Sequence, residues 1–176
     1  MNICVFCSAQ NVAPIYQDAA REFATLIGKK GHALVWGGSN TGTMKVIADA
    51  TQSAGGKIMG ISVETFKHDA RKNADEMIVA PTLTERKKIL LEKSDAILVL
   101  PGGLGTLDEM TEALELKKQD AHNKPIVFLN TDRFYDGFLT QLARMEKDGF
   151  LPREMSNYVN FADTPEDAMR YIEDHA

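Results

Sequence analysis

Long apolar runs are absent from this chain of 176 residues, so no segment is long enough to span a membrane as a helix. The start of the chain also lacks a leader pattern, because Met1 to Val5 leads directly into an apolar strand. We therefore expect a cytoplasmic protein with no membrane partner.

An excess of basic residues is also absent. The chain has 20 Lys and Arg against 25 Asp and Glu, a net charge of −5, and no basic cluster interleaved with aromatic residues. Extended nucleic acid is therefore not expected as a partner. A single nucleotide stays compatible with this composition, because it needs only a few local cations.

Cysteine is scarce, and the two that occur, Cys4 and Cys7, fall in or beside the first strand. Residues three apart in a strand face opposite sides, so we expect two buried structural thiols and neither a disulfide nor a shared metal. Histidines and carboxylates with metal-ligand spacing are missing too, and we predict no metal and no cofactor. The Walker, G-x-G-x-x-G and G-x-S-x-G patterns are absent, which disfavours an ATPase, a dinucleotide oxidoreductase and a serine hydrolase.

What the chain does contain is a regular alternation of strand and helix patterns. Strands are expected at 2–7, 33–36, 57–62, 76–80, 95–100, 125–130 and 158–161, and helices at 14–30, from the second loop to 54, and at 82–93, 134–148 and 164–174. The strands are continuously apolar, as in parallel sheets covered on both faces. We predict an α/β fold, a Rossmann-like doubly wound parallel sheet in three layers, as one domain over residues 1–176. Ligands of such sheets bind at the carboxyl edge, near the point where the strand order switches.

The most informative segment is P-G-G-L-G-T-L-D-E at 101–109, which follows a strand and opens a helix. Its bare backbone N–H groups can approach a phosphate at the positive end of the helix dipole. It also supplies two carboxylates, Asp108 and Glu109, where a P-loop has a lysine. A structural alternative is a capping box, in which Thr106 caps the helix and Glu109 reaches back to it.

Two further segments are expected at the same edge of the sheet. Gly37 and Gly38 begin a second glycine-rich turn between a strand and a helix, and the pair of loops could line opposite walls of one cleft. Arg86 and Lys87 lie near the start of the 82–93 helix, where an arginine can clamp a phosphate or ribose with its forked donors. A solvated charged face is the alternative interpretation of this run.

The 101–109 segment, together with Glu85-Arg86-Lys87, resembles the paired signature of the LOG family, the cytokinin riboside 5'-monophosphate phosphoribohydrolases often labelled lysine decarboxylases. The resemblance extends over nearly the whole chain. It implies a Rossmann-like homodimer with active sites near the subunit interface, and hydrolysis of the N-glycosidic bond of an adenine-type nucleoside monophosphate. It also implies that Arg86 and Glu109 form the catalytic pair. Apolar residues in the 82–93 helix (Leu83, Ile89, Leu90 and Leu91) favour a dimer as well.

On this interpretation Glu109 stabilises the positive charge that develops on the ribose, while Arg86 orients it. The predicted substrate-binding residues are Ser8, Gly37, Gly38, Lys87, Gly102, Gly103, Leu104, Gly105, Thr106 and Asp108. The chain departs from the family pattern at Ser8, Ser39, Lys45 and residues 67–70, so the base is left unspecified. The main alternative is a carrier of a phosphorylated small molecule without catalysis, similar to molybdenum cofactor carrier proteins. Lysine decarboxylation is disfavoured, because no lysine has the context of a pyridoxal phosphate site.

Overall fold

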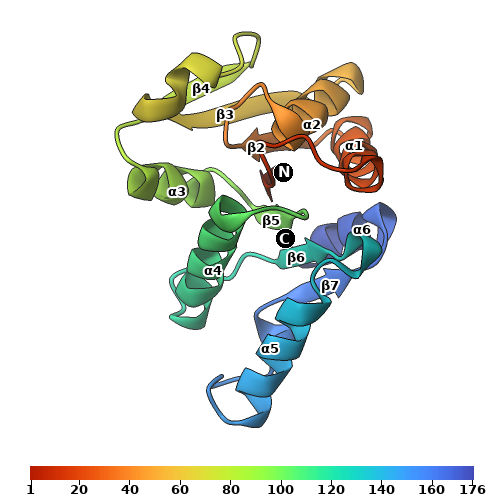
Figure 1. Ribbon diagram of the computed structural model, residues 1–176, viewed down its shortest axis with the longest axis vertical. Coiled ribbons are helices and arrows are strands. Elements are labelled where there is room, and N and C mark those ends of the chain that lie inside the picture. Colours follow the sequence, from red (N-terminus) through yellow and green to blue (C-terminus); the bar gives the residue numbers. More distant parts are fainter.

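The computed structural model describes residues 1–176 and contains a single sheet of seven parallel strands. The strands and helices alternate along the chain (Figure 1). In chain order they are β1 (Asn2–Phe6), α1 (Pro14–Lys29), β2 (Ala33–Trp36), α2 (Gly42–Ser53), β3 (Lys57–Val63), the 3₁₀ helix η1 (Glu64–Asp69), β4 (Glu76–Ala80), α3 (Leu83–Glu92), β5 (Ala96–Val99), α4 (Leu104–Lys118), β6 (Ile126–Leu129), η2 (Thr131–Arg133), α5 (Asp136–Lys147), η3 (Met155–Asn157), β7 (Asn160–Ala162) and α6 (Pro165–His175).

The strand order is β4-β3-β2-β1-β5-β6-β7, so the direction of winding reverses between β1 and β5. This confirms the doubly wound parallel sheet. The register aligns Val5 with Trp36 and Phe6 with Val99, which brings the carboxyl ends of β1, β2 and β5 to one edge. The two glycine-rich loops, which follow β2 and β5, therefore both start from this edge.

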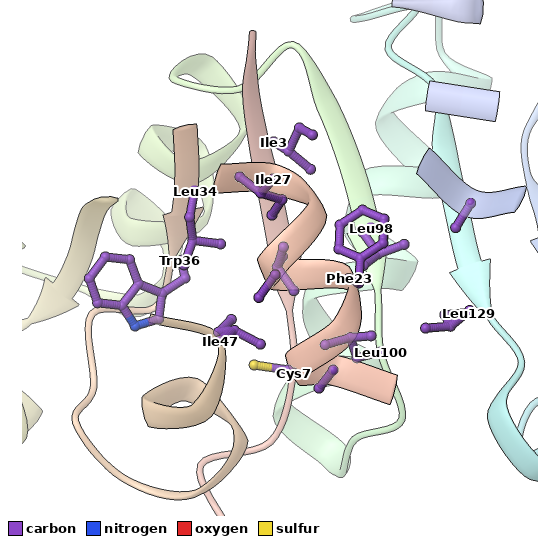
Figure 2. Close-up of a cluster of buried hydrophobic side chains, with 14 of the residues drawn as sticks. Ile3, Cys7, Phe23, Ile27, Leu34, Trp36, Ile47, Leu98, Leu100 and Leu129 are labelled. Atoms are coloured by element: carbon purple, nitrogen blue, oxygen red, sulfur yellow. The ribbon is translucent and has the colours of Figure 1, made fainter. Parts of the chain in front are cut away.

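Two apolar clusters, one on each face of the sheet, form the core. One cluster packs α1, α2 and α6 against the sheet and includes Phe23 and Ile27 of α1 and Trp36 of β2 (Figure 2). The other contains residues of α3, α4 and α5, including Leu90, Met110 and Leu142. Figure 1 shows these two groups of helices on opposite sides of the sheet. No helix is long and apolar enough to cross a membrane.

The two cysteines separate as expected. Cys4 lies in the cluster under α3 and α4, while Cys7, directly after β1, lies in the cluster under α1 and α2. Both thiols are buried and free.

The segment between β3 and β4 contains η1 and a bridge between Ser39 and Ala70. One local expectation was wrong. Helix α3 lacks the free apolar face expected of it, since Leu90 is fully buried and Ile89 and Leu91 pack against the core, leaving Leu83 as its exposed large apolar side chain. The exposed apolar surface lies instead between α4 and α5. A cavity of about 540 Å³ there is lined by residues that include Leu114, Phe138, Met145 and Phe150.

Candidate functional site

Helix α3 begins immediately beyond the carboxyl end of β4 and places two cations there. Thr82 caps the helix, because its hydroxyl accepts the backbone N–H of Glu85 at 3.2 Å. Arg86 and Lys87 follow within the first two turns. The threonine cap of this site therefore belongs to Thr82 of α3, and the adjacent cations extend toward α4.

Helix α4 begins earlier than a capping box at Thr106 requires. Its N-cap is Gly103, which has no side chain to cap with, and its first residue is Leu104. Thr106 is consequently already inside the helix, where its side chain packs against Gly102; a Cβ on Gly102 would lie 2.2 Å from the Thr106 hydroxyl oxygen. The structural alternative of a capping box formed by Thr106 and Glu109 is therefore ruled out, since Glu109 is the sixth residue of the helix and is buried.

Arg86 and Glu109 meet as an ion pair between α3 and α4. The Nη2 atom of Arg86 lies 3.1 Å from Oε1 of Glu109, and the two side chains are only 12% and 7% exposed. Arg86 Nε also donates to the carbonyl oxygen of Ile61 at the end of β3, at 2.9 Å. Three elements therefore fix the guanidinium: α3 carries it, β3 accepts its hydrogen bond, and α4 supplies the carboxylate.

The first glycine loop makes this arrangement sterically possible. A Cβ at Gly37 would lie 2.2 Å from Arg86 Nη2, so any other residue there would collide with the guanidinium. The absence of a side chain at Gly37 therefore leaves room for the Arg86 guanidinium in its ion pair with Glu109.

The Glu109 carboxyl has an unusual protonation equilibrium. Burial raises its pKa from the ordinary value of 4.5 to about 7. The neighbouring guanidinium of Arg86 lowers this pKa, Asp108 raises it and Lys87 lowers it, but the guanidinium offsets only part of the effect of burial. A carboxyl that titrates near neutral pH can both accept and release a proton under cellular conditions, which suits a general base.

Lys87 also reaches from α3 to α4, where it contacts the carboxylates that flank Glu109. Its ammonium lies 3.0 and 2.9 Å from the two carboxylate oxygens of Asp108, and it also pairs with Glu112. Burial alone would lower the pKa of Lys87, but its hydrogen bonds to Glu112 and Asp108 raise that pKa above its ordinary value. The ammonium is therefore charged and already paired with two carboxylates.

The second glycine loop exposes a row of backbone donors. The first intrahelical bond of α4 runs from the N–H of Leu107 to the carbonyl of Gly103, and the N–H groups of residues 102–106 have no protein acceptor. A Cβ at Gly103 or at Gly105 would meet nothing within 4 Å, and Leu104 is 84% exposed. Free N–H groups at a helix N-terminus can bind an anion such as a phosphate. No three His, Cys, Asp or Glu side chains are grouped to hold a metal ion.

The remaining predicted residues, Gly38 and Ser8, lie on the other side of the first loop. The carbonyl of Gly38 accepts the N–H of Arg71 at 2.8 Å, which attaches the segment after η1 to this loop. Ser8 accepts the N–H of Gln10 on its hydroxyl at 3.0 Å and the N–H of Met44 on its carbonyl at 3.2 Å, joining the end of β1 to α2.

Arg71 is the residue that the sequence analysis missed. Its guanidinium is 6% exposed and contacts Asn40 at 3.1 Å, Gln52 at 2.6 Å and Asp49 at 2.7 Å. It thereby fixes the segment after η1 against α2 and the first loop. No local pattern distinguishes Arg71 from Lys67 or Lys72 nearby, because its partners are distant in sequence.

Comparisons with known proteins agree on the family. Residues 44–172, well over half of the chain, match the family model described as "Possible lysine decarboxylase". The cytokinin riboside 5'-monophosphate phosphoribohydrolase of Mycobacterium tuberculosis is 33% identical over 170 residues, covering 96% of this chain and 91% of that protein. The cytokinin riboside 5'-monophosphate phosphoribohydrolase LOG5 of Arabidopsis thaliana is 34% identical over 85% of this chain and 67% of its own length.

Among solved structures, the molybdenum cofactor binding protein of Rippkaea orientalis superimposes with a TM-score of 0.77 and 26% identity. The match covers 98% of this chain and 95% of that one. This likeness supports the Rossmann-like fold. The matched protein binds the molybdenum cofactor, as do the carrier proteins that the sequence left as an alternative.

Proposed function

This chain belongs to the LOG family, and we propose that it hydrolyses the N-glycosidic bond of an adenine-type nucleoside 5'-monophosphate to free base and ribose 5-phosphate. One observation carries the proposal. The buried carboxylate of Glu109, paired with Arg86, lies on the same helix whose N-terminus has five unpaired N–H groups. An anion-binding turn and a carboxylate that titrates near neutral pH are thus held in one rigid element.

The phosphate would bind to the N–H groups of residues 102–106, at the positive end of the α4 dipole. Glu109 lies more than one turn further along α4, away from that end. A carboxylate beside the phosphate would repel it, so we place the ribose, and not the phosphate, next to Glu109.

Cleavage of the C1'–N bond builds positive charge on the ribose ring. The Glu109 carboxylate would stabilise that charge and take a proton from the water that attacks C1'. The base departs with the bonding electron pair and takes a proton from solvent water, and Glu109 returns its own proton to solvent, so one water is consumed for each bond cleaved. A pKa of about 7 matches this proton transfer to the working pH. Arg86 stays protonated throughout and would orient Glu109 and the substrate.

Lysine decarboxylation, the activity in the description of the family model, has less support. A lysine that forms a Schiff base must be available as the neutral amine, which usually means a lowered pKa. Lys87, which follows Arg86, does not meet this requirement, because its two carboxylate partners raise its pKa and favour the charged ammonium.

A carrier protein remains the second candidate, and the structural likeness to the molybdenum cofactor binding protein favours it. The donor row of residues 102–106 would serve a phosphorylated pterin as well as a nucleotide. The buried Arg86–Glu109 pair favours the enzyme, because a carrier has no need of a carboxylate that titrates near neutral pH.

We also propose that the protein is a homodimer. The apolar cavity between α4 and α5, lined in part by the 76% exposed Phe150, is the apolar surface that a second copy of the chain would cover. Light scattering at micromolar concentration should give twice the mass of the chain, and a strict monomer would contradict this proposal.

The function is tested by incubating the protein with AMP, prenylated AMP, other nucleoside 5'-monophosphates and adenosine, and separating released base by chromatography. We expect base and ribose 5-phosphate from at least one adenine-type monophosphate, and much slower release from adenosine. Tight binding of a phosphorylated pterin with no base released from any nucleotide would favour the carrier.

A further inference from the structure

We propose that Lys87 is a positioning residue, which ties α3 to α4 and so holds the Glu109 carboxylate opposite Arg86. The inference rests on the proposed function for its kinetic test, but one of its tests needs no activity. It also revises the role expected of Lys87, which the sequence suggested as a substrate-binding cation.

Two neighbouring sets of ion pairs join α3 to α4. Arg86 and Lys87 are neighbours on α3, and their respective partners Glu109 and Asp108 are neighbours on α4. Asp108 and Glu112 are four residues apart, so they share one face of α4, and the Lys87 ammonium lies between them. A rotation or shift of α4 that moved Glu109 away from Arg86 would therefore also break the contacts of Lys87.

The burial and the contacts of the Lys87 side chain support a structural role for this residue. The side chain is only 15% exposed, whereas Lys88, the next residue of α3, is 72% exposed. Its ammonium contacts both oxygens of Asp108 and one oxygen of Glu112, so these two carboxylates already engage its donors. Lys87, Glu109 and Glu112 line one cavity of about 10 Å³, too small for more than one water.

Ionisable groups on three elements surround Glu109. Arg86 and Lys87 on α3 and Asp108 on α4 shift its pKa, Glu112 on α4 lines the same small cavity, and the thiols of Cys4 and Cys7 belong to β1 or directly follow it. Burial raises the pKa of both thiols, so they stay neutral. Loss of Lys87 would remove a cation and also leave the negative charge of Asp108 uncompensated, and both changes raise the pKa of Glu109.

The first test measures Glu109 directly, by ¹³C NMR titration of its carboxyl, assigned through the loss of its signal in Glu109→Gln. In Lys87→Met we expect the midpoint to move upward by about one pH unit. Lys88→Met removes the same charge from the same helix and should leave the midpoint unchanged. Adding Asp108→Asn to Lys87→Met should reverse part of the shift. An unchanged midpoint in folded Lys87→Met would overturn the proposal, whether or not the wild type hydrolyses AMP.

The second test separates positioning from substrate binding. If Lys87 positions Glu109, Lys87→Met should lower kcat for AMP about tenfold at neutral pH and leave KM nearly unchanged. If Lys87 binds the phosphate, KM should rise and the preference for AMP over adenosine should fall, which would overturn the proposal. Should Lys87→Met fail to fold by circular dichroism, Lys87→Arg decides. That variant keeps the charge but not the geometry, so the proposal expects a lower kcat, and unchanged kinetics would contradict it.

Discussion

The two glycine-rich loops look alike in sequence, but their glycines have different steric surroundings in the structure. At Gly37 a Cβ would lie 2.2 Å from Arg86 Nη2, so a side chain there would displace the guanidinium from its place beside Glu109. At Gly103 and Gly105 a side chain would meet nothing, and the neighbouring N–H groups have no acceptor. The first loop is shaped by an internal contact, whereas the second is open to a ligand.

This difference assigns separate tasks to the two loops. Gly37 leaves room for the ion pair of Arg86 with Glu109, so under the proposed function it would serve the chemical step. The N–H groups after β5 would serve phosphate binding. Substitutions in the first loop should therefore act on turnover, and those in the second on affinity.

The largest effect is expected for Gly37→Ala. The new Cβ would displace the Arg86 guanidinium from Glu109, and a misplacement of about 1 Å can lower turnover roughly a hundredfold. We expect kcat for AMP to fall on that scale, with KM changed much less. Gly137→Ala is the matched control, because a Cβ at Gly137 in α5 meets nothing within 4 Å. Equal kinetics for both variants would show that Gly37 has no role in placing Arg86.

The second prediction concerns the charge that the first loop helps to position. Glu109 has a pKa of about 7 in the folded protein against 4.5 ordinarily, so the folded state binds more protons than the unfolded chain between these values. The free energy of unfolding should therefore fall as pH rises through this window. Glutamine stays neutral, so between pH 5 and pH 8.5 Glu109→Gln should gain about 2 to 3 kcal/mol relative to wild type.

Urea unfolding of both proteins at several pH values measures this difference. If the two proteins lose stability in parallel across the window, the raised pKa of Glu109 is wrong.

A smaller and opposite pair of effects is expected for Gly105→Ala. Alanine favours the helix, so the free energy of unfolding should rise by about 0.5 to 1 kcal/mol. The methyl group would stand where the phosphate approaches the N–H groups, so KM for AMP should rise about tenfold while that for adenosine changes little. Chemical unfolding and steady-state kinetics test both halves. A more stable variant with an unchanged KM for AMP would remove residues 102–106 from the phosphate site.

Much of the fold followed from the sequence. Each apolar strand and each amphipathic helix was located within a few residues, and the parallel arrangement followed from strands that are apolar on both faces. The pairing of Arg86 with Glu109 came from the family resemblance, because the two residues lie on different helices and no spacing rule connects them.

Other features depended on tertiary contacts. The start of α4 could not be placed within a run of glycines, and so a cap at Thr106 stayed open as an alternative, although Gly103 occupies that position. A side chain at position 37 would conflict with Arg86, which lies far away in the chain. The hydrogen-bond partners of Arg71 are also distant in sequence. Lys87 was expected to bind substrate, since its pairing with Asp108 and Glu112 depends on how α3 lies against α4.

The account is tested most directly by the rate of adenine release from AMP by the wild type and by Glu109→Gln, with folding of both checked by circular dichroism. Glutamine keeps the size and much of the hydrogen bonding of Glu109 but removes its charge and its ability to accept a proton. The account predicts that the wild type releases adenine and that folded Glu109→Gln does so at least about a hundredfold more slowly. Equal rates from the two folded proteins would contradict it.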